Sequence, residues 1–128
     1  MIKCILVFLG GGLGALCRFG VTVAVQGLAA AVQRAGAIFP FGTLVVNTAG
    51  AFAIGLSFAA FESAFLPAGL RLFVVTGFLG GFTTFSAYSM ESARLFLNGS
   101  AGNAIVNILC NNALCLVCAA LGMWLGQR

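Results

Sequence analysis

Four long apolar stretches divide the chain, at residues 2–32, 41–61, 70–97 and 104–125. A helix needs about 20 predominantly apolar residues to cross the hydrocarbon core of a bilayer, and each stretch is that long. None of them shows the alternation with period two that marks the strands of a membrane β-barrel. The sequence therefore predicts an all-α membrane protein, with residues 1–128 forming a single four-helix transmembrane domain in the lipid bilayer.

The composition supports a membrane class, because 62% of the residues are hydrophobic and only 6% are charged. Soluble domains are about 25% charged, and this chain has too few polar side chains to cover a soluble surface. Its six basic residues form no run, which argues against a nucleic-acid partner. There is no histidine, and the only acidic residues are Glu62 and Glu91. No acid–base or nucleophile–base pair can be assembled from them, so we expect that the protein is not an enzyme.

Five cysteines lie within the apolar stretches, and Cys115 and Cys118 have the Cys-x-x-Cys spacing of some redox and zinc sites. The sequence offers neither histidine nor a second such pair, and no polar surroundings that would favour a thiolate. We therefore predict free thiols that behave as small buried hydrophobic groups.

The distribution of basic residues gives almost no preference for one orientation in the membrane. Four spans place both termini on one side together with the 62–69 connection. That side carries Lys3, Arg71 and Arg128, and the other carries Arg34 and Arg94. Because basic residues favour the cytoplasmic side, three against two is nearly balanced. We therefore hypothesise that the chain inserts in both orientations and forms an antiparallel homodimer.

Polar residues inside the first two spans are informative, because burying an unpaired polar group is costly. Arg18 lies near the middle of the first span, where it either faces a water-filled cavity or extends to the membrane interface. Thr43 and Asn47 are four residues apart and share one helix face. The two N–H donors of the Asn47 amide suit an anion or a carbonyl of a neighbouring helix, and the second use is the more common.

The fourth span carries Asn103, Asn107, Asn111 and Cys115 at intervals of four residues, with Asn112 beside them. This spacing places the side chains in one stripe along a helix. Several asparagines on one face are not expected to meet lipid. They either line a hydrated track or join helices by hydrogen bonds, and the sequence leaves both alternatives open.

The third span contains three glycines followed by threonine and serine, within residues 76–89. Each glycine weakens a helix by up to about 1 kcal/mol relative to alanine, and the hydroxyl side chains can stabilise a break. Broken membrane helices leave backbone carbonyls unpaired, and such carbonyls coordinate small cations. Phe85 and Tyr88 follow, and the positive edges of their rings either attract an anion or simply pack. We therefore predict that the third helix is broken in the middle of the membrane.

Three motifs in order resemble the CrcB/Fluc family of fluoride channels. They are GALCRF at residues 14–19, GTLVVN at 42–47 and TGFLGGFTTFS at 76–86, and the resemblance covers almost the whole chain. It implies an antiparallel dual-topology homodimer in a bacterial plasma membrane, with two narrow fluoride pathways along the subunit interface. The implied function is passive export of fluoride, which lowers its toxicity in the cell.

The resemblance also implies roles for individual residues. Asn47 donates to fluoride, Phe85 offers its ring edge, Arg18 lies near the vestibule, and Glu91 matches an acidic position after the aromatic motif. With their polar neighbours, the expected fluoride pathway comprises Asn47, Phe85, Tyr88, Ser86, Thr43, Asn107, Asn111, Arg18 and Glu91. The backbone carbonyls of Gly80 and Thr83 are expected to hold a structural sodium ion shared by both subunits.

The chain departs from the family pattern at three places. Tyr88 stands where a second phenylalanine is usual, Ala87 lacks a hydroxyl, and asparagines replace the small hydroxyl residues of the fourth span. Two other functions remain as alternatives. A proton-coupled multidrug-type exporter needs a carboxylate within the membrane, and Glu62 and Glu91 are expected near span ends. A structural subunit of the membrane would explain the glycines and asparagines by packing alone.

Overall fold

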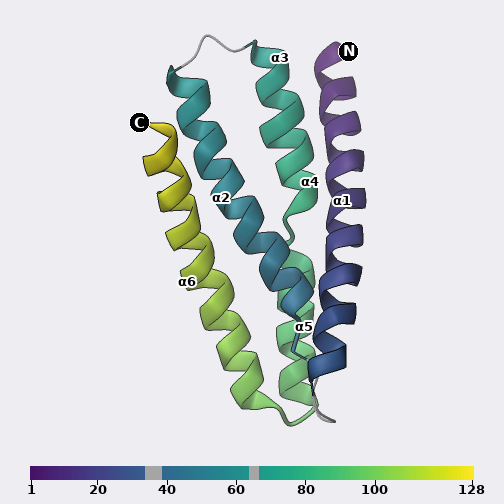
Figure 1. Cartoon of the computed structure of the whole chain (residues 1–128). Coiled ribbons are helices and arrows are strands. Elements are labelled where there is room, and N and C mark those ends of the chain that lie inside the picture. Colours follow the sequence, from purple (N-terminus) through teal and green to yellow (C-terminus); the bar gives the residue numbers. More distant parts are fainter. Residues whose placement is uncertain (34–38, 64–66) are drawn as a thin grey trace.

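The computed structural model describes residues 1–33, 39–63 and 67–128 and shows an elongated bundle of helices (Figure 1). Three spans are unbroken: α1 (Ile2–Val32), α2 (Phe41–Ser63) and α6 (Ala101–Gly126). The third span consists of α3 (Ala68–Arg71), the π-helix η1 (Leu72–Leu79), α4 (Gly80–Phe82) and α5 (Phe85–Leu97). Both termini lie at the same end of the bundle (Figure 1). Arg34, counted above for orientation, lies outside the described residues.

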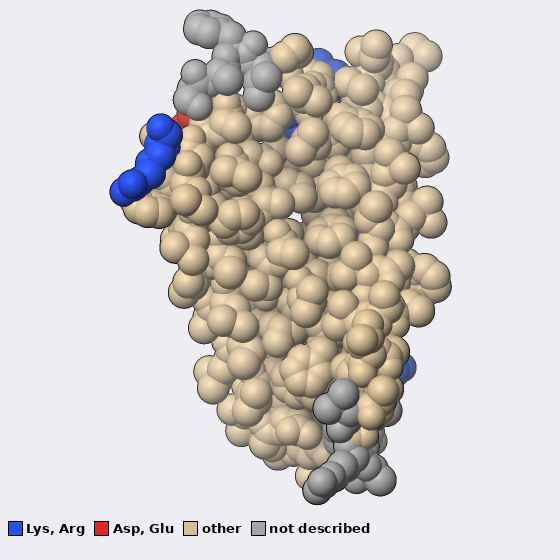
Figure 2. All heavy atoms as spheres, viewed as in Figure 1, with Lys and Arg blue, Asp and Glu red and all other residues tan. Residues whose placement is uncertain are grey.

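The described residues include four helices that are long and apolar enough to cross a membrane. Their outer surface is apolar, as shown by Phe8, Leu16 and Leu116, which are 78%, 69% and 73% exposed. On the face shown in Figure 2, uncharged atoms dominate the long middle part of the molecule. The prediction of a multi-pass membrane protein is therefore confirmed. The fourth span begins three residues earlier than predicted, at Ala101.

Glycines bring α1 into direct contact with the backbone of the third span. A Cβ atom at Gly10 would overlap the Phe73 carbonyl oxygen, and one at Gly14 would overlap the Phe78 carbonyl oxygen. From the other side, a Cβ atom at Gly81 would overlap the backbone of Gly11. Small residues let membrane helices approach closely and gain van der Waals contact. These glycines are therefore packing residues.

Close packing at glycines also joins α2 to α6, at the opposite side of the bundle. A Cβ atom at Gly55 would overlap the Ala119 carbonyl oxygen, and one at Gly122 would overlap the Phe52 carbonyl oxygen. Lipid is as apolar as the helix surfaces, so close packing has to supply the association energy. The two glycine contacts fix how α2 and α6 lie against each other.

The third span is broken at Thr83 and Thr84, both of which have extended backbones (φ −78°, ψ 156° and φ −149°, ψ 118°). The last helical hydrogen bond before the break runs from Thr83 N to Leu79 O (3.0 Å). Thr84 then caps α5 by accepting a hydrogen bond from Ala87 N at its side-chain oxygen (3.3 Å). The predicted break is therefore confirmed, but it follows the glycines, which remain helical. Two of them, Gly77 and Gly81, pack against the backbone of α1.

All five cysteines are free. Cys4 and Cys17 are exposed in the single chain, so the expectation that every thiol is buried is wrong for these two. A thiol is a small apolar group, and it is as compatible with surrounding lipid as with a protein core.

Candidate functional site

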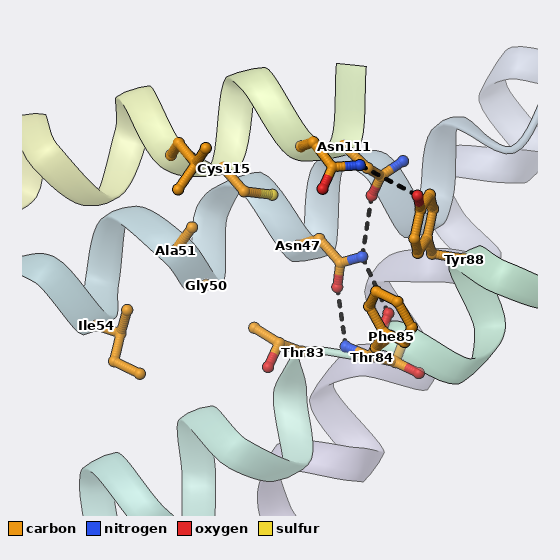
Figure 3. A pocket seen from close by; sticks show the side chains of 12 residues that line it. Asn47, Gly50, Ala51, Ile54, Thr83, Thr84, Phe85, Tyr88, Asn111 and Cys115 are labelled. Carbon is orange, nitrogen blue, oxygen red and sulfur yellow. Dashed lines mark hydrogen bonds between the residues drawn. The ribbon is translucent and has the colours of Figure 1, made fainter. Parts of the chain in front are cut away.

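Asn47 of α2 holds the broken segment in place (Figure 3). Its Nδ2 donates to Thr84 O (3.0 Å), and its Oδ1 accepts from Thr84 N (2.8 Å). The other hydrogen of Nδ2 is donated to Asn111 Oδ1 of α6 (3.0 Å). The amide thus replaces the helical partners that Thr84 has lost, and inside one chain both of its donors are used to join helices.

The hydrogen bonds continue from Asn47 along a buried chain of side chains. Asn111 Nδ2 donates to Asn107 Oδ1 (2.9 Å), Asn107 Nδ2 to Ser92 Oγ (2.9 Å), and Ser92 Oγ to Tyr88 O (2.8 Å). We call Asn47, Asn111, Asn107 and Ser92 the amide ladder. Asn107 is fully buried and Asn111 is 5% exposed, so these two asparagines join α6 to α2 and α5. Asn103, at the end of the predicted stripe, is exposed.

One pocket, of about 390 Å³, opens between α2, α6 and the break. We call it the aromatic pocket. Its polar and aromatic lining comprises Asn47, Thr83, Thr84, Phe85, Tyr88, Asn111 and Asn112. The Phe85 and Tyr88 rings meet edge to face, with centroids 5.2 Å apart. Tyr88 is 9% exposed, whereas Phe85 is 77% exposed in the single chain.

A second pocket, of about 480 Å³, lies between α1, α2 and α5 and contains both charged groups of the site. We call it the charged pocket. Its polar and charged lining comprises Arg18, Thr22, Thr43, Thr84, Ser86 and Glu91. Arg18 is half-buried and lines this pocket.

Glu91 lines the charged pocket together with Arg18, so the structure brings together two residues of the expected pathway. Its Oε1 accepts a hydrogen bond from Thr43 Oγ1 (2.6 Å), and Thr43 is only 2% exposed. Its Oε2 is buried and has no partner in the described part of the chain.

Thr84 lines both pockets and is the residue that they share. Its Oγ1 lies 3.3 Å from Ser86 Oγ, which lines the charged pocket. The prediction missed Thr84, although a hydroxyl residue three positions before Ala87 fits the helix N-cap pattern. Thr22, Ser92 and Asn112 were also missed, because nothing in the sequence shows which polar side chains of different spans meet.

The helix break leaves carbonyl oxygens that can bind a cation. Within the described residues, neither Gly80 O nor Thr83 O accepts a hydrogen bond from the backbone, and Thr84 N is taken by Asn47. The described part contains no group of three or more His, Cys, Asp and Glu side chains suited to a metal. Backbone oxygens are ligands for hard cations, so the break fits such an ion better than any side-chain cluster does.

These features define a small multi-pass membrane protein with a broken helix between two polar pockets. Residues 5–123 match the family model described as CrcB-like protein, Camphor Resistance (CrcB). The chain belongs to this family.

Curated relatives cover nearly the same length. A protein of Citrifermentans bemidjiense is 41% identical over 128 residues, which are 99% of this chain and 98% of the relative. A protein of Syntrophotalea carbinolica is 43% identical over 119 residues, 92% of each chain. A third, from Hydrogenobaculum, is 41% identical over 121 residues, 94% of this chain and 93% of the relative. All three carry the name Fluoride-specific ion channel FluC.

Proposed function

We propose that this protein is a fluoride-selective channel that passively exports fluoride from the cytoplasm. The observation that carries the proposal is a pair of pockets that contain polar side chains and share Thr84, inside an otherwise apolar bundle. The identity of the ion is inferred from the names of relatives that match nearly the full chain. Fluoride is small and strongly hydrated, so its path has to replace water with closely placed donors.

The residues of the two pockets offer such donors without a deep electrostatic trap. Arg18 attracts anions to the charged pocket, and the hydroxyls of Thr84 and Ser86 follow at the break. Beyond it, the positive ring edges of Phe85 and Tyr88 face the ion in the aromatic pocket. Binding that is weak and spread over several groups lets an ion leave again, as conduction requires.

The proposal includes an antiparallel homodimer, in which a second copy closes the pathway. In one chain the aromatic pocket is open on one side, and Phe85 is 77% exposed although its ring lines that pocket. An aqueous route has to be walled from lipid on all sides. Tags on the termini should be accessible from both membrane faces. Accessibility from a single face would contradict the antiparallel arrangement.

A structural sodium ion at the break is a further part of the proposal. Gly80 O and Thr83 O are without backbone donors, but two carbonyls are too few for a cation, so a second copy has to supply more. Thermal unfolding of the dimer in sodium and in potassium salts tests this idea. The unfolding temperature should be higher in sodium, whereas equal temperatures would contradict a sodium site.

Fluoride efflux from liposomes that contain only the purified protein tests the main proposal. The three candidate functions differ in outcome. A channel releases fluoride down its gradient, a proton-coupled exporter moves its substrate only with a proton gradient, and a structural subunit moves nothing. The exporter is included in the test because the carboxylate of Glu91, which such a protein would need for proton coupling, lies in a pocket with Arg18. Flux that requires a proton gradient, or no flux, would refute the channel.

A matched pair of phenylalanines tests the role of the aromatic pocket. Phe85→Ile removes a positive ring edge from the pocket and should reduce fluoride flux at least about tenfold, the equivalent of one lost ion contact. Phe8→Ile is the control, because Phe8 is equally exposed (78% against 77%) but lines neither pocket. Equal flux in the two variants would place the fluoride pathway elsewhere.

A further inference from the structure

The hydroxyl of Tyr88 has no equivalent on a phenylalanine, and the structure gives it a fixed position. Asn112 Nδ2 donates to the Tyr88 oxygen (3.1 Å) and also to Ile108 O, one turn earlier on α6 (2.7 Å). The second bond holds the Asn112 amide against its own helix. The first therefore ties the end of the Tyr88 ring to α6, while the ring itself lies beside Phe85 (Figure 3).

This contact determines where the hydroxyl hydrogen of Tyr88 points. A phenol oxygen donates one hydrogen and accepts others, with both kinds of bond close to the ring plane. Because Asn112 occupies an acceptor position of the oxygen, the hydrogen has to point away from Asn112. No described residue accepts it, although Tyr88 is only 9% exposed. Tyr88 lines the aromatic pocket, so a ligand bound in that pocket can accept the hydroxyl hydrogen.

We propose that the Tyr88 hydroxyl is a direct hydrogen-bond donor to the anion in the aromatic pocket, and that Asn112 is the residue that positions it. This inference rests on the proposed fluoride channel and adds a neutral donor to its path. A hydroxyl close to two ring edges strengthens binding of a small anion that accepts short hydrogen bonds. It gives less advantage to a larger, more weakly hydrated halide, so it also contributes to selectivity.

The test measures fluoride flux against fluoride concentration for Tyr88→Phe, Asn112→Leu and the double variant. Tyr88→Phe should still conduct, because the ring remains, but its half-saturating fluoride concentration should rise about tenfold, as for the loss of one charge-assisted hydrogen bond. Asn112→Leu should change it in the same direction. The double variant should be no worse than Tyr88→Phe, because Asn112 acts only through the hydroxyl.

The results separate this inference from the proposed function. Absence of fluoride flux in the unsubstituted protein refutes the channel itself. Normal flux with an unchanged half-saturating concentration in Tyr88→Phe refutes only the hydroxyl donor. Fully additive effects of the two substitutions also refute it, because Asn112 would then act independently of Tyr88.

A second measurement uses the fact that Tyr88 is the only tyrosine in the chain. Replacing tyrosine by 3-fluorotyrosine during expression changes this one ring and makes its hydroxyl a stronger hydrogen-bond donor. At neutral pH the half-saturating fluoride concentration should fall below that of the normal protein. A hydroxyl that only joins α5 to α6 would leave this concentration unchanged, and that result would overturn the proposal.

Discussion

The two halves of the third span are attached to the bundle in different ways. Before the break, η1 and α4 pack on α1 through glycines whose neighbours are backbone atoms. After the break, α5 is joined to α6 by hydrogen bonds between buried asparagine and serine side chains. Close packing is rigid and tolerates no added atom, whereas hydrogen bonds leave room for pockets between the helices. The polar site therefore lies at and after the break.

The largest expected effect comes from disturbing the glycine-packed half. Gly14→Val would drive side-chain atoms into the Phe78 carbonyl, so the helices have to separate. We expect a loss of at least about 3 kcal/mol, the upper range for overpacking, or no folded protein at all. Gly12→Val is the control, because a Cβ atom there has no neighbour within 4 Å. Thermal unfolding in detergent compares the two, and similar stability would contradict the packing role.

A smaller effect is expected from the hydrogen-bonded half. Asn107→Leu removes the centre of the amide ladder. Ser92 Oγ then loses its donor, and Asn111 Nδ2 keeps only the backbone acceptor Asn107 O. Unsatisfied buried groups cost about 1–3 kcal/mol, so stability should fall by that amount. Ser92→Ala should cost less in this background than in the normal protein, because the bond to Asn107 is already lost. Additive losses in the double variant would show that the two side chains do not interact.

The smallest effect should come from Thr43, which links α2 to α5 in the charged pocket. Thr43→Val removes the hydroxyl that donates to Glu91 Oε1 and should cost about 0.5–1.5 kcal/mol, as for one typical hydrogen bond. Thr48→Val is matched to it on the same helix, because Thr48 Oγ1 is buried beside the weakly hydrogen-bonding thiol of Cys115 and has no carboxylate partner in the described residues. Unfolding measurements should show Thr48→Val as neutral or stabilising. Equal losses would contradict the Glu91 contact.

The sequence predicted the four spans, the break and most of the polar and aromatic residues that line the two pockets. Hydrophobic length and helical spacing are local properties. The sequence did not show that both N–H donors of Asn47 bind Thr84 and Asn111. The same two donors can bind an anion or a carbonyl oxygen, so the residue type does not distinguish these partners. The sequence also did not show that Glu91 accepts a hydrogen bond from Thr43, because the two residues lie on different spans. Which side chains of different spans pair depends on the tertiary structure, so it cannot be predicted from the sequence of one span.

The stripe of asparagines illustrates the same limit. Spacing alone placed Asn107 and Asn111 on one face, and the structure shows both in the amide ladder. Asn111 also lines the aromatic pocket, whereas Asn107 lines neither pocket. Their inclusion in the fluoride pathway stays a prediction, with better structural support for Asn111.

The most direct test of the account is the fluoride efflux rate of Asn47→Ala in liposomes, compared with Asn103→Ala. Asn47 connects the break to the amide ladder and lines the aromatic pocket, whereas Asn103 is an exposed asparagine at the end of the stripe on α6. With both variants shown to be folded dimers, Asn103→Ala should release fluoride at the normal rate. Asn47→Ala should release it no faster than empty liposomes do. Normal efflux from folded Asn47→Ala would contradict the claim that fluoride passes at the break.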